Sequence, residues 1–226
     1  MFDFMTNNAE KMHGFVNKQF VKKFITYFAG KDNWHNLDSS KGNMGYGFIH
    51  YSLLRVWHPK SILCIGSKYG YVPAVLALGC KEDVCGHVDF VDANYDEQSE
   101  DHWGGVGYWS SPQGRDAFEK FGLKKYITTY VQTTKVFKQA NPKKKWDYIY
   151  FDGNHSYEGV KNDFELFYPS LQKGGLLLFH DIYLERFKNL NYGVKKFIHE
   201  LEEERIFSIL KIPGQFGLAV IQKNEK

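Results

Sequence analysis

Four side chains that could bind a metal ion or transfer a proton stand at the ends of two apolar segments. Asp152 directly follows the run "YIYF", and His155 comes three residues later. The pair His180 and Asp181 ends a second apolar run, "LLLF". Carboxylates are ligands for hard divalent cations, and imidazole accepts protons near neutral pH. Each residue alone has a simpler interpretation, a helix cap for Asp152 or a structural hydrogen bond for each histidine. Their repetition on two segments favours a functional site.

The segments that must position these residues alternate between strand and helix patterns. Short apolar runs rich in β-branched and aromatic residues predict five strands, over 61–66, 87–93, 126–133, 146–152 and 174–181. Helical spacing predicts helices over 71–79, 156–171 and 194–201. A closing hairpin is predicted from 206–212 and 217–223. The alternation predicts an α/β fold, a Rossmann-like doubly wound sheet that is mostly parallel, with one antiparallel C-terminal strand and helices on both faces.

The first 58 residues carry a different pattern. Apolar side chains at helical spacing, with lysines between them, predict an amphipathic helix through Met12, Phe15, Val16, Phe20, Phe24 and Phe28. A second helix is predicted over 47–57, before Pro59. We therefore expect an N-terminal helical cap over 1–58 and a Rossmann-like domain over 59–226, forming one compact unit. The amphipathic helix packs on this domain or forms a homo-oligomer contact, and a membrane-surface helix is the alternative.

Ligands of such sheets bind beyond the carboxyl ends of the strands, where Gly66, Asp92, Asp152 and Asp181 all lie. Glycines at a strand–helix turn let the backbone approach a ligand, although Gly66 and Gly70 alone are equally typical of any such turn. A carboxylate placed like Asp92 can accept both hydrogen bonds of a ribose diol. Together these residues predict a nucleoside site. The aromatic loop over 94–114 is long enough to act as its lid.

The composition also argues against several other classes of protein. The 226 residues carry a formal net charge of +3, which does not indicate a nucleic-acid partner. No segment is apolar and long enough to span a bilayer, and the N-terminus lacks the apolar core of a signal peptide. Three cysteines are too few for a disulfide framework. These features predict a cytoplasmic protein without a membrane partner.

The motifs also carry a family resemblance. The strand–"IGSKYG"–helix unit, "VDFVDA" and the block "WDYIYFDGNHSYEGVKNDFELFYPSLQKGGLLLFHDI" resemble class I S-adenosylmethionine-dependent methyltransferases. The last block is the most specific, and is similar to the macrocin-type and rhamnosyl-type sugar O-methyltransferases and to cephalosporin-hydroxylase-like proteins. The resemblance covers roughly 61–223. It implies an S-adenosylmethionine-dependent O-methyltransferase that acts on a hydroxyl of a small sugar-like or polyol molecule.

The resemblance also implies roles for individual residues. The cofactor-binding set is Gly66, Ser67, Tyr69, Gly70, Asp92, Ala93 and Asp152. The metal set, for magnesium, is Asp152, Asp181 and His180. The catalytic set is His155, Asp152 and His180, with His155 as the base that takes the hydroxyl proton.

Two departures from the family pattern leave alternatives open. Cys64 stands where the family has an acidic residue, and Lys68 replaces the middle glycine of the loop. We expect the Lys68 ammonium to point away from the cofactor's sulfonium or to pair with an acid. The departures favour a non-catalytic nucleoside-binding protein as one alternative. The other is a nicotinamide-dependent oxidoreductase, against which the missing G-x-G-x-x-G pattern argues.

Overall fold

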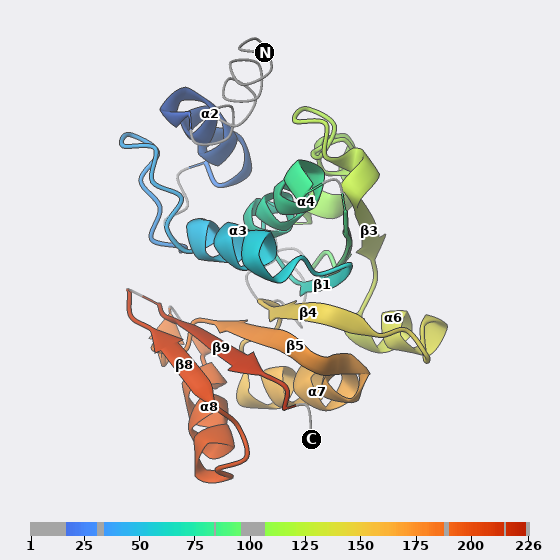
Figure 1. The fold of residues 1–226 in the computed structure, drawn as a ribbon, viewed down its shortest axis with the longest axis vertical. Helices are drawn as coiled ribbons and strands as arrows, with labels where there is room; N and C mark the ends of the chain where they lie inside the picture. The colour runs from blue at the N-terminus through green and yellow to red at the C-terminus, as the bar shows by residue number, and fades with distance from the viewer. Residues whose placement is uncertain are drawn as a thin grey trace, which may run out of the picture.

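The computed structural model describes residues 17–30, 34–83, 85–95, 107–187, 190–214 and 216–224. Its centre is a seven-stranded sheet in the order β3-β2-β1-β4-β5-β9-β8 (Figure 1). The strands of this sheet are β1 (Ser61–Ile65), β2 (His87–Asp92), β3 (Ile127–Val131), β4 (Trp146–Phe151), β5 (Leu171–His180), β8 (Ile209–Ile212) and β9 (Leu218–Gln222). The first five pair in parallel, and β9 runs antiparallel to both neighbours. The predicted doubly wound sheet with one antiparallel C-terminal strand is therefore confirmed.

Helices cover both faces of the sheet, as Figure 1 shows. The helices of the described residues are α2 (Lys18–Phe28), α3 (Tyr46–Trp57), α4 (Tyr71–Asp83), α5 (Pro112–Arg115), α6 (Thr134–Ala140), α7 (Tyr157–Phe167) and α8 (Val194–Glu203). Short 3₁₀ turns cover Tyr108–Ser110, Lys124–Tyr126 and Tyr168–Ser170. None of the described helices combines the length and the apolar character needed to cross a bilayer.

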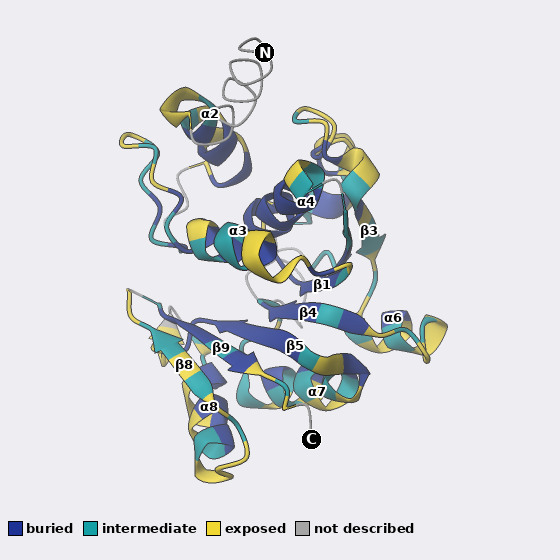
Figure 2. Ribbon diagram, viewed as in Figure 1, coloured by how far each residue is buried: buried dark blue, intermediate teal, exposed yellow. Residues whose placement is uncertain are grey.

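The hydrophobic core has two halves, one on each face of the sheet. Most residues of the central strands are buried, as Figure 2 shows. Strand β1 shows how a two-residue period divides them. Ile62 and Cys64 face α3 and α4, while Leu63 and Ile65 face α6, α7 and α8. A strand buried on both faces needs a continuous apolar run, as "SILCI" provides.

Helix α2 packs its apolar face on the rest of this chain. Phe24 and Phe28 are buried, and both contact the ring of Phe121 at centroid distances of 5.2 and 5.6 Å. The Asn17 side chain caps the helix by accepting a hydrogen bond from the Gln19 N–H. An oligomer contact through α2 would have to use its other face. The predicted helical positions Met12, Phe15 and Val16 lie outside the described residues.

Some elements differ from the sequence expectation. Helix α6 and the small hairpin of β6 (Arg186–Phe187) and β7 (Leu190–Asn191) were not predicted, because each is too short to show a period. Trp109, from the expected lid, lines the larger of the two cavities described below, but it is buried. This side chain is 2% exposed and stacks on Phe118, with its edge toward Phe90, so it is part of the core. Most of the expected lid, 96–106, lies outside the described residues.

Candidate active site

The residues of the site directly follow four residues that are paired in register on four neighbouring parallel strands. The paired residues are Val91, Ile65, Phe151 and Phe179, from β2, β1, β4 and β5. The residues that directly follow them are Asp92, Gly66, Asp152 and His180. Because parallel strands in this register end at one edge, these residues lie next to one another at the carboxyl edge of the sheet.

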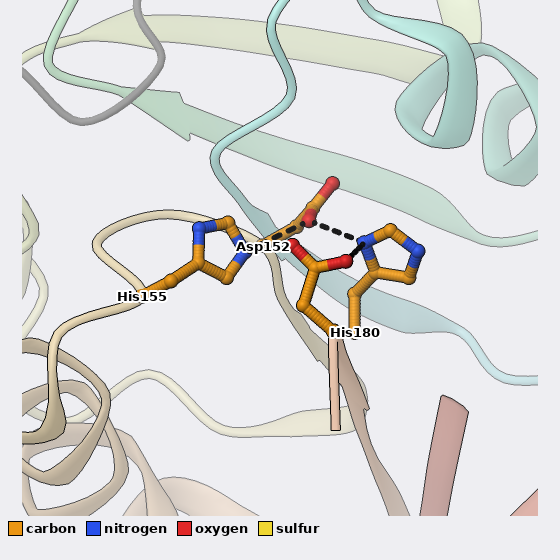
Figure 3. A group of neighbouring side chains, drawn as sticks. Asp152, His155 and His180 are labelled. Atoms are coloured by element: carbon orange, nitrogen blue, oxygen red, sulfur yellow. Dashed lines mark hydrogen bonds and ion pairs between the residues drawn. The ribbon is translucent and has the colours of Figure 1, made fainter. Parts of the chain in front are cut away.

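Asp152, His155, His180 and Asp181 form a compact cluster, and each offers a ligand atom within 4.8 Å of the others. Their side chains are between 2% and 13% exposed. Nδ1 of His180 lies 3.1 Å from Oδ1 of Asp152 and 3.1 Å from Oδ1 of Asp181. Nε2 of His155 lies 3.3 Å from an oxygen of each aspartate. Figure 3 shows the two imidazole rings on either side of Asp152.

The local fold holds these four side chains in place. The Asp152 N–H donates to the Ile65 carbonyl at 2.8 Å, which continues the ladder between β4 and β1. The ring of His155 stacks on Tyr192 at 5.2 Å. Asp181 has a φ of 61°, in the left-handed region that costs a non-glycine residue energy. Strand β5 ends at His180, immediately before this left-handed residue, and the side chain of Asp181 is buried beside His180.

The cluster carries unusual charges. Burial opposes ionisation of Asp152, but the charge of His180 and hydrogen bonds from both histidines hold its pKa well below its usual range. Burial raises the pKa of Asp181. Burial alone would lower the pKa of His180, yet Asp181 and Asp152 raise it to about 9. The site therefore holds two carboxylates that need a positive charge between them.

The orientation of His180 specifies where that charge is needed. Its Nε2 lies 3.0 Å from the carbonyl oxygen of Trp34, so Nε2 carries a hydrogen and donates it. In the neutral ring, the Nδ1 lone pair would then face two carboxylate oxygens. Either a proton or a metal ion must occupy that side. Oδ1 of Asp181 is also buried without a hydrogen bond. Two carboxylates and an imidazole nitrogen thus fit a divalent cation.

A cavity of about 250 Å³ lies over the ends of β1, β2 and β3. Of the predicted cofactor residues, Gly66, Ser67, Asp92, Ala93 and Asp152 line it. Asp92 accepts hydrogen bonds from the N–H groups of Asn94 at 2.7 Å and Ser67 at 3.3 Å. Burial raises the pKa of Asp92 to about 6. This cavity has the carboxylate and the backbone loop that a nucleoside needs.

A second cavity, about 90 Å³, adjoins the first and shares Ser67, Lys68 and Asp152 with it. Its floor is made of the cluster residues Asp152, His155, His180 and Asp181. Its walls are aromatic, and consist of Phe28, Trp34, Tyr69, Tyr71 and Tyr192, with His35. The predicted cofactor residue Tyr69 lines this second cavity and not the first.

Close packing explains why positions 66 and 70 of the loop are glycines. A Cβ on Gly66, whose φ is +72°, would lie 2.3 Å from the Asp152 carbonyl oxygen. A Cβ on Gly70, at φ +86°, would lie 2.6 Å from the Trp109 ring. Gly66 therefore lets the ends of β1 and β4 approach each other. Gly70, a predicted cofactor residue, lines neither cavity and makes room for Trp109.

Sequence reasoning missed the contribution of the segment before β1. The ring of His35 contacts that of His180 at a centroid distance of 4.6 Å with the ring planes tilted, and burial lowers the pKa of His35 to about 3, so its ring is neutral. His50 lies deeper, where its Nδ1 is 2.6 Å from the Tyr148 hydroxyl. The only signal for these residues was the presence of histidines in an aperiodic loop and on a helix, which gives no partner.

Comparison with known proteins identifies the family. A family model described as a methyltransferase domain matches residues 63–182, more than half of the chain. The chain belongs to this methyltransferase family. Its fold is that of the class I S-adenosylmethionine-dependent methyltransferases, which the motifs resemble. No curated protein sequence matches the chain significantly.

Solved methyltransferases share this fold at low sequence identity. The O-methyltransferase from Bacillus cereus in complex with SAH is 17% identical, with a TM-score of 0.63 over 96% of this chain and 97% of that one. TomG from Streptomyces achromogenes in complex with SAM is 13% identical, with a TM-score of 0.61 over 92% and 89%. The SAH-bound PaMTH1 from Podospora anserina is 16% identical, with a TM-score of 0.61 over 99% and 97%.

Proposed function

We propose that this methyltransferase uses S-adenosylmethionine to methylate a hydroxyl of a small sugar-like or polyol molecule. The observation that carries the proposal is the junction of the two cavities at Asp152. The larger cavity has the features of a nucleoside site, and the smaller one ends on a cluster able to handle a hydroxyl proton. Solved relatives of the same fold bind SAM or SAH, which supports the assignment of the larger cavity.

In this proposal the chain itself holds and orients the two reactants. Asp92 accepts the hydroxyl hydrogens of the cofactor's ribose, while Ser67 and Ala93 border the same cavity. The cofactor supplies an electrophilic methyl group. The aromatic walls of the smaller cavity hold the acceptor, which makes methyl transfer an oriented reaction between bound partners. A hydroxyl between the carboxylates lies beside Nε2 of His155, and this nitrogen takes its proton.

A divalent ion is the second part of the proposal. Asp152, Asp181 and Nδ1 of His180 would hold it, and it would polarise the acceptor hydroxyl. Magnesium, which the resemblance implies, prefers oxygen ligands throughout. Because His180 offers nitrogen, a first-row ion such as manganese(II) fits this donor set better. The three free cysteines, Cys64, Cys80 and Cys85, support the reducing cytoplasm as the place of action.

Calorimetry tests the assignment. The wild-type protein is titrated with S-adenosylmethionine and, separately, with NAD. We expect S-adenosylmethionine to bind and NAD not to bind. Asp92→Ala should weaken cofactor binding by about 1.5–3 kcal/mol, the scale of a hydrogen bond to a charged group. Binding of NAD alone would identify an oxidoreductase. Cofactor binding without methyl transfer to any hydroxyl compound would favour a non-catalytic nucleoside-binding protein.

A further inference from the structure

Lys68 lies between the two cavities and takes part in neither of the roles assigned above. It is in the turn between β1 and α4, its side chain is exposed, and it lines both cavities. A long cationic side chain at this position must be explained by what it meets.

The surroundings of Lys68 place its ammonium on the side of the smaller cavity. Nζ lies 5.8 Å from the ring centroid of Trp34 and 5.8 Å from that of Tyr69. Both rings line the smaller cavity and not the larger one. Such contacts with aromatic faces hold a cation in place without neutralising it. In the described part of the chain, Lys68 forms no salt bridge with a carboxylate.

The smaller cavity is therefore lined by two different charged features. One is the cluster, in which His180 or a divalent ion balances the carboxylates of Asp152 and Asp181, and the other is the exposed ammonium of Lys68. A ligand with its hydroxyl at the cluster would meet this ammonium with another part of its structure. A single ammonium among neutral rings balances a single negative charge. A phosphate carries nearly two charges and usually recruits several donors, so it fits this rim less well.

We propose that Lys68 binds a carboxylate of the methyl acceptor, so that the substrate is a hydroxy acid with its hydroxyl and carboxylate at opposite ends. This inference rests on the proposed function, because it takes the smaller cavity as the acceptor site. The exposed ammonium then acts as a specificity determinant. It selects acidic acceptors over neutral ones of the same shape.

Two matched pairs of probes test the proposal by calorimetry, with a divalent ion present. The pairs are glucuronate against glucose and protocatechuate against catechol. We expect the wild type to bind the acid of at least one pair about tenfold more tightly than its neutral partner, the scale of one charge-assisted contact. Lys68→Met should bind both members equally. Lys120→Met is the matched control, because Lys120 is also exposed and lies 4.3 Å from the Tyr27 ring centroid, but lines neither cavity.

A second experiment tests whether Lys68 instead binds the other carboxylate that could lie nearby, that of the cofactor's methionine. S-adenosylhomocysteine carries this carboxylate and methylthioadenosine lacks it. We expect Lys68→Met to leave the affinity for both unchanged. A loss confined to S-adenosylhomocysteine would assign Lys68 to the cofactor and overturn the proposal. Equal binding of acid and neutral probes to the wild type, or no binding of either acid at millimolar concentration, would also overturn it.

The acceptor titrations are run with and without S-adenosylhomocysteine. If S-adenosylhomocysteine does not bind, the proposed function fails, yet the anion preference at Lys68 is still measured. If it binds and the acids show no preference, only the inference about Lys68 fails.

Discussion

Nδ1 of His180 faces Oδ1 of Asp152 at 3.1 Å, while the opposite nitrogen of the same ring is held by a backbone carbonyl. The tautomer is thereby fixed, because a carbonyl oxygen can only accept. The ring cannot rotate to offer its other nitrogen without losing a buried hydrogen bond. The lone pair of Nδ1 is consequently oriented to bind a cation that lies between the two carboxylates. Metal-binding histidines are commonly oriented in this way, by a hydrogen bond from their other ring nitrogen.

Metal preference is the first prediction. We expect manganese(II) or cobalt(II) to raise the melting temperature at concentrations about tenfold or more below those needed for magnesium, because imidazole favours first-row ions. His180→Asp makes the donor set all-oxygen, so it should narrow or reverse this preference. Visible absorption of the cobalt(II) protein reports the nitrogen ligand directly and should change in the variant.

The control for this prediction is His35→Asn, because the ring of His35 contacts that of His180 but His35 is not among the four ligand residues. It should keep the ion preference of the wild type. If magnesium and manganese(II) are equally effective, or if no ion alters the melting temperature, the metal assignment is wrong.

Asp181 should show a conflict between stability and function. Burial raises its pKa, so ionisation at pH 7 costs folding free energy. Asn tolerates the φ of 61° and removes the charge. Asp181→Asn should therefore raise the free energy of unfolding of the metal-free protein. The same variant should lose the shift in melting temperature caused by metal ions. Chemical denaturation at pH 7 measures the first effect, and a less stable variant would contradict the prediction.

The sheet was predictable because its signals are local. The runs "SILCI", "HVDFVD" and "WDYIYF" are mostly buried, are rich in apolar and aromatic residues, and are ended or followed by a glycine or an aspartate. A parallel sheet then places those breaking residues at one edge without further information. For this reason Asp92, Asp152 and His180 could be assigned to one cleft from the sequence.

The walls of the acceptor cavity could not be predicted in this way. Trp34 and His35 come from an aperiodic loop before the sheet, and Tyr192 comes from the segment between β7 and α8. Their positions depend on tertiary packing, which no local period encodes. Trp109 was assigned to a lid from an aperiodic segment; it does line the larger cavity, but its burial against the core could not be predicted from the sequence.

Cofactor affinity should depend on pH through Asp92. Burial raises the pKa of this carboxyl to about 6, and only the ionised form accepts both ribose hydroxyl hydrogens. The affinity for S-adenosylhomocysteine should therefore increase as the pH rises through about 6, and Asp92→Asn should abolish the increase. Asp163→Asn is the matched control, because Asp163 lines the same cavity and its pKa is also raised to about 6 by burial. A pH dependence lost in Asp163→Asn instead would assign the effect to that residue.

The same shift has a consequence for stability, and its sign is opposite to that of the binding effect. The folded pKa of Asp92 exceeds the ordinary value of 3.8, so the folded state binds the proton more tightly. The free energy of unfolding of the ligand-free protein should fall as the pH rises from 3.8 to about 6, and Asp92→Asn should reduce this fall. Urea denaturation across this range measures the difference between the two proteins.

His155 should affect the chemical step and not cofactor binding. Its Nε2 lies 3.3 Å from an oxygen of Asp152 and of Asp181, where an acceptor hydroxyl would lie. It does not line the larger cavity. His155→Asn should therefore lower the single-turnover rate of methyl transfer by about 10²–10⁴-fold, the usual contribution of a general base. The affinity for S-adenosylhomocysteine should stay unchanged.

A purely structural role for His155 makes a different prediction. Its ring stacks on Tyr192, so a structural residue would be replaced at a cost in stability and with little effect on the rate. Tyr192→Phe keeps the stacked ring and serves as the control for packing in this region. If His155→Asn is less stable than the wild type but transfers methyl groups at the same rate, His155 only supports the wall of the cavity, and the proton must leave by another route.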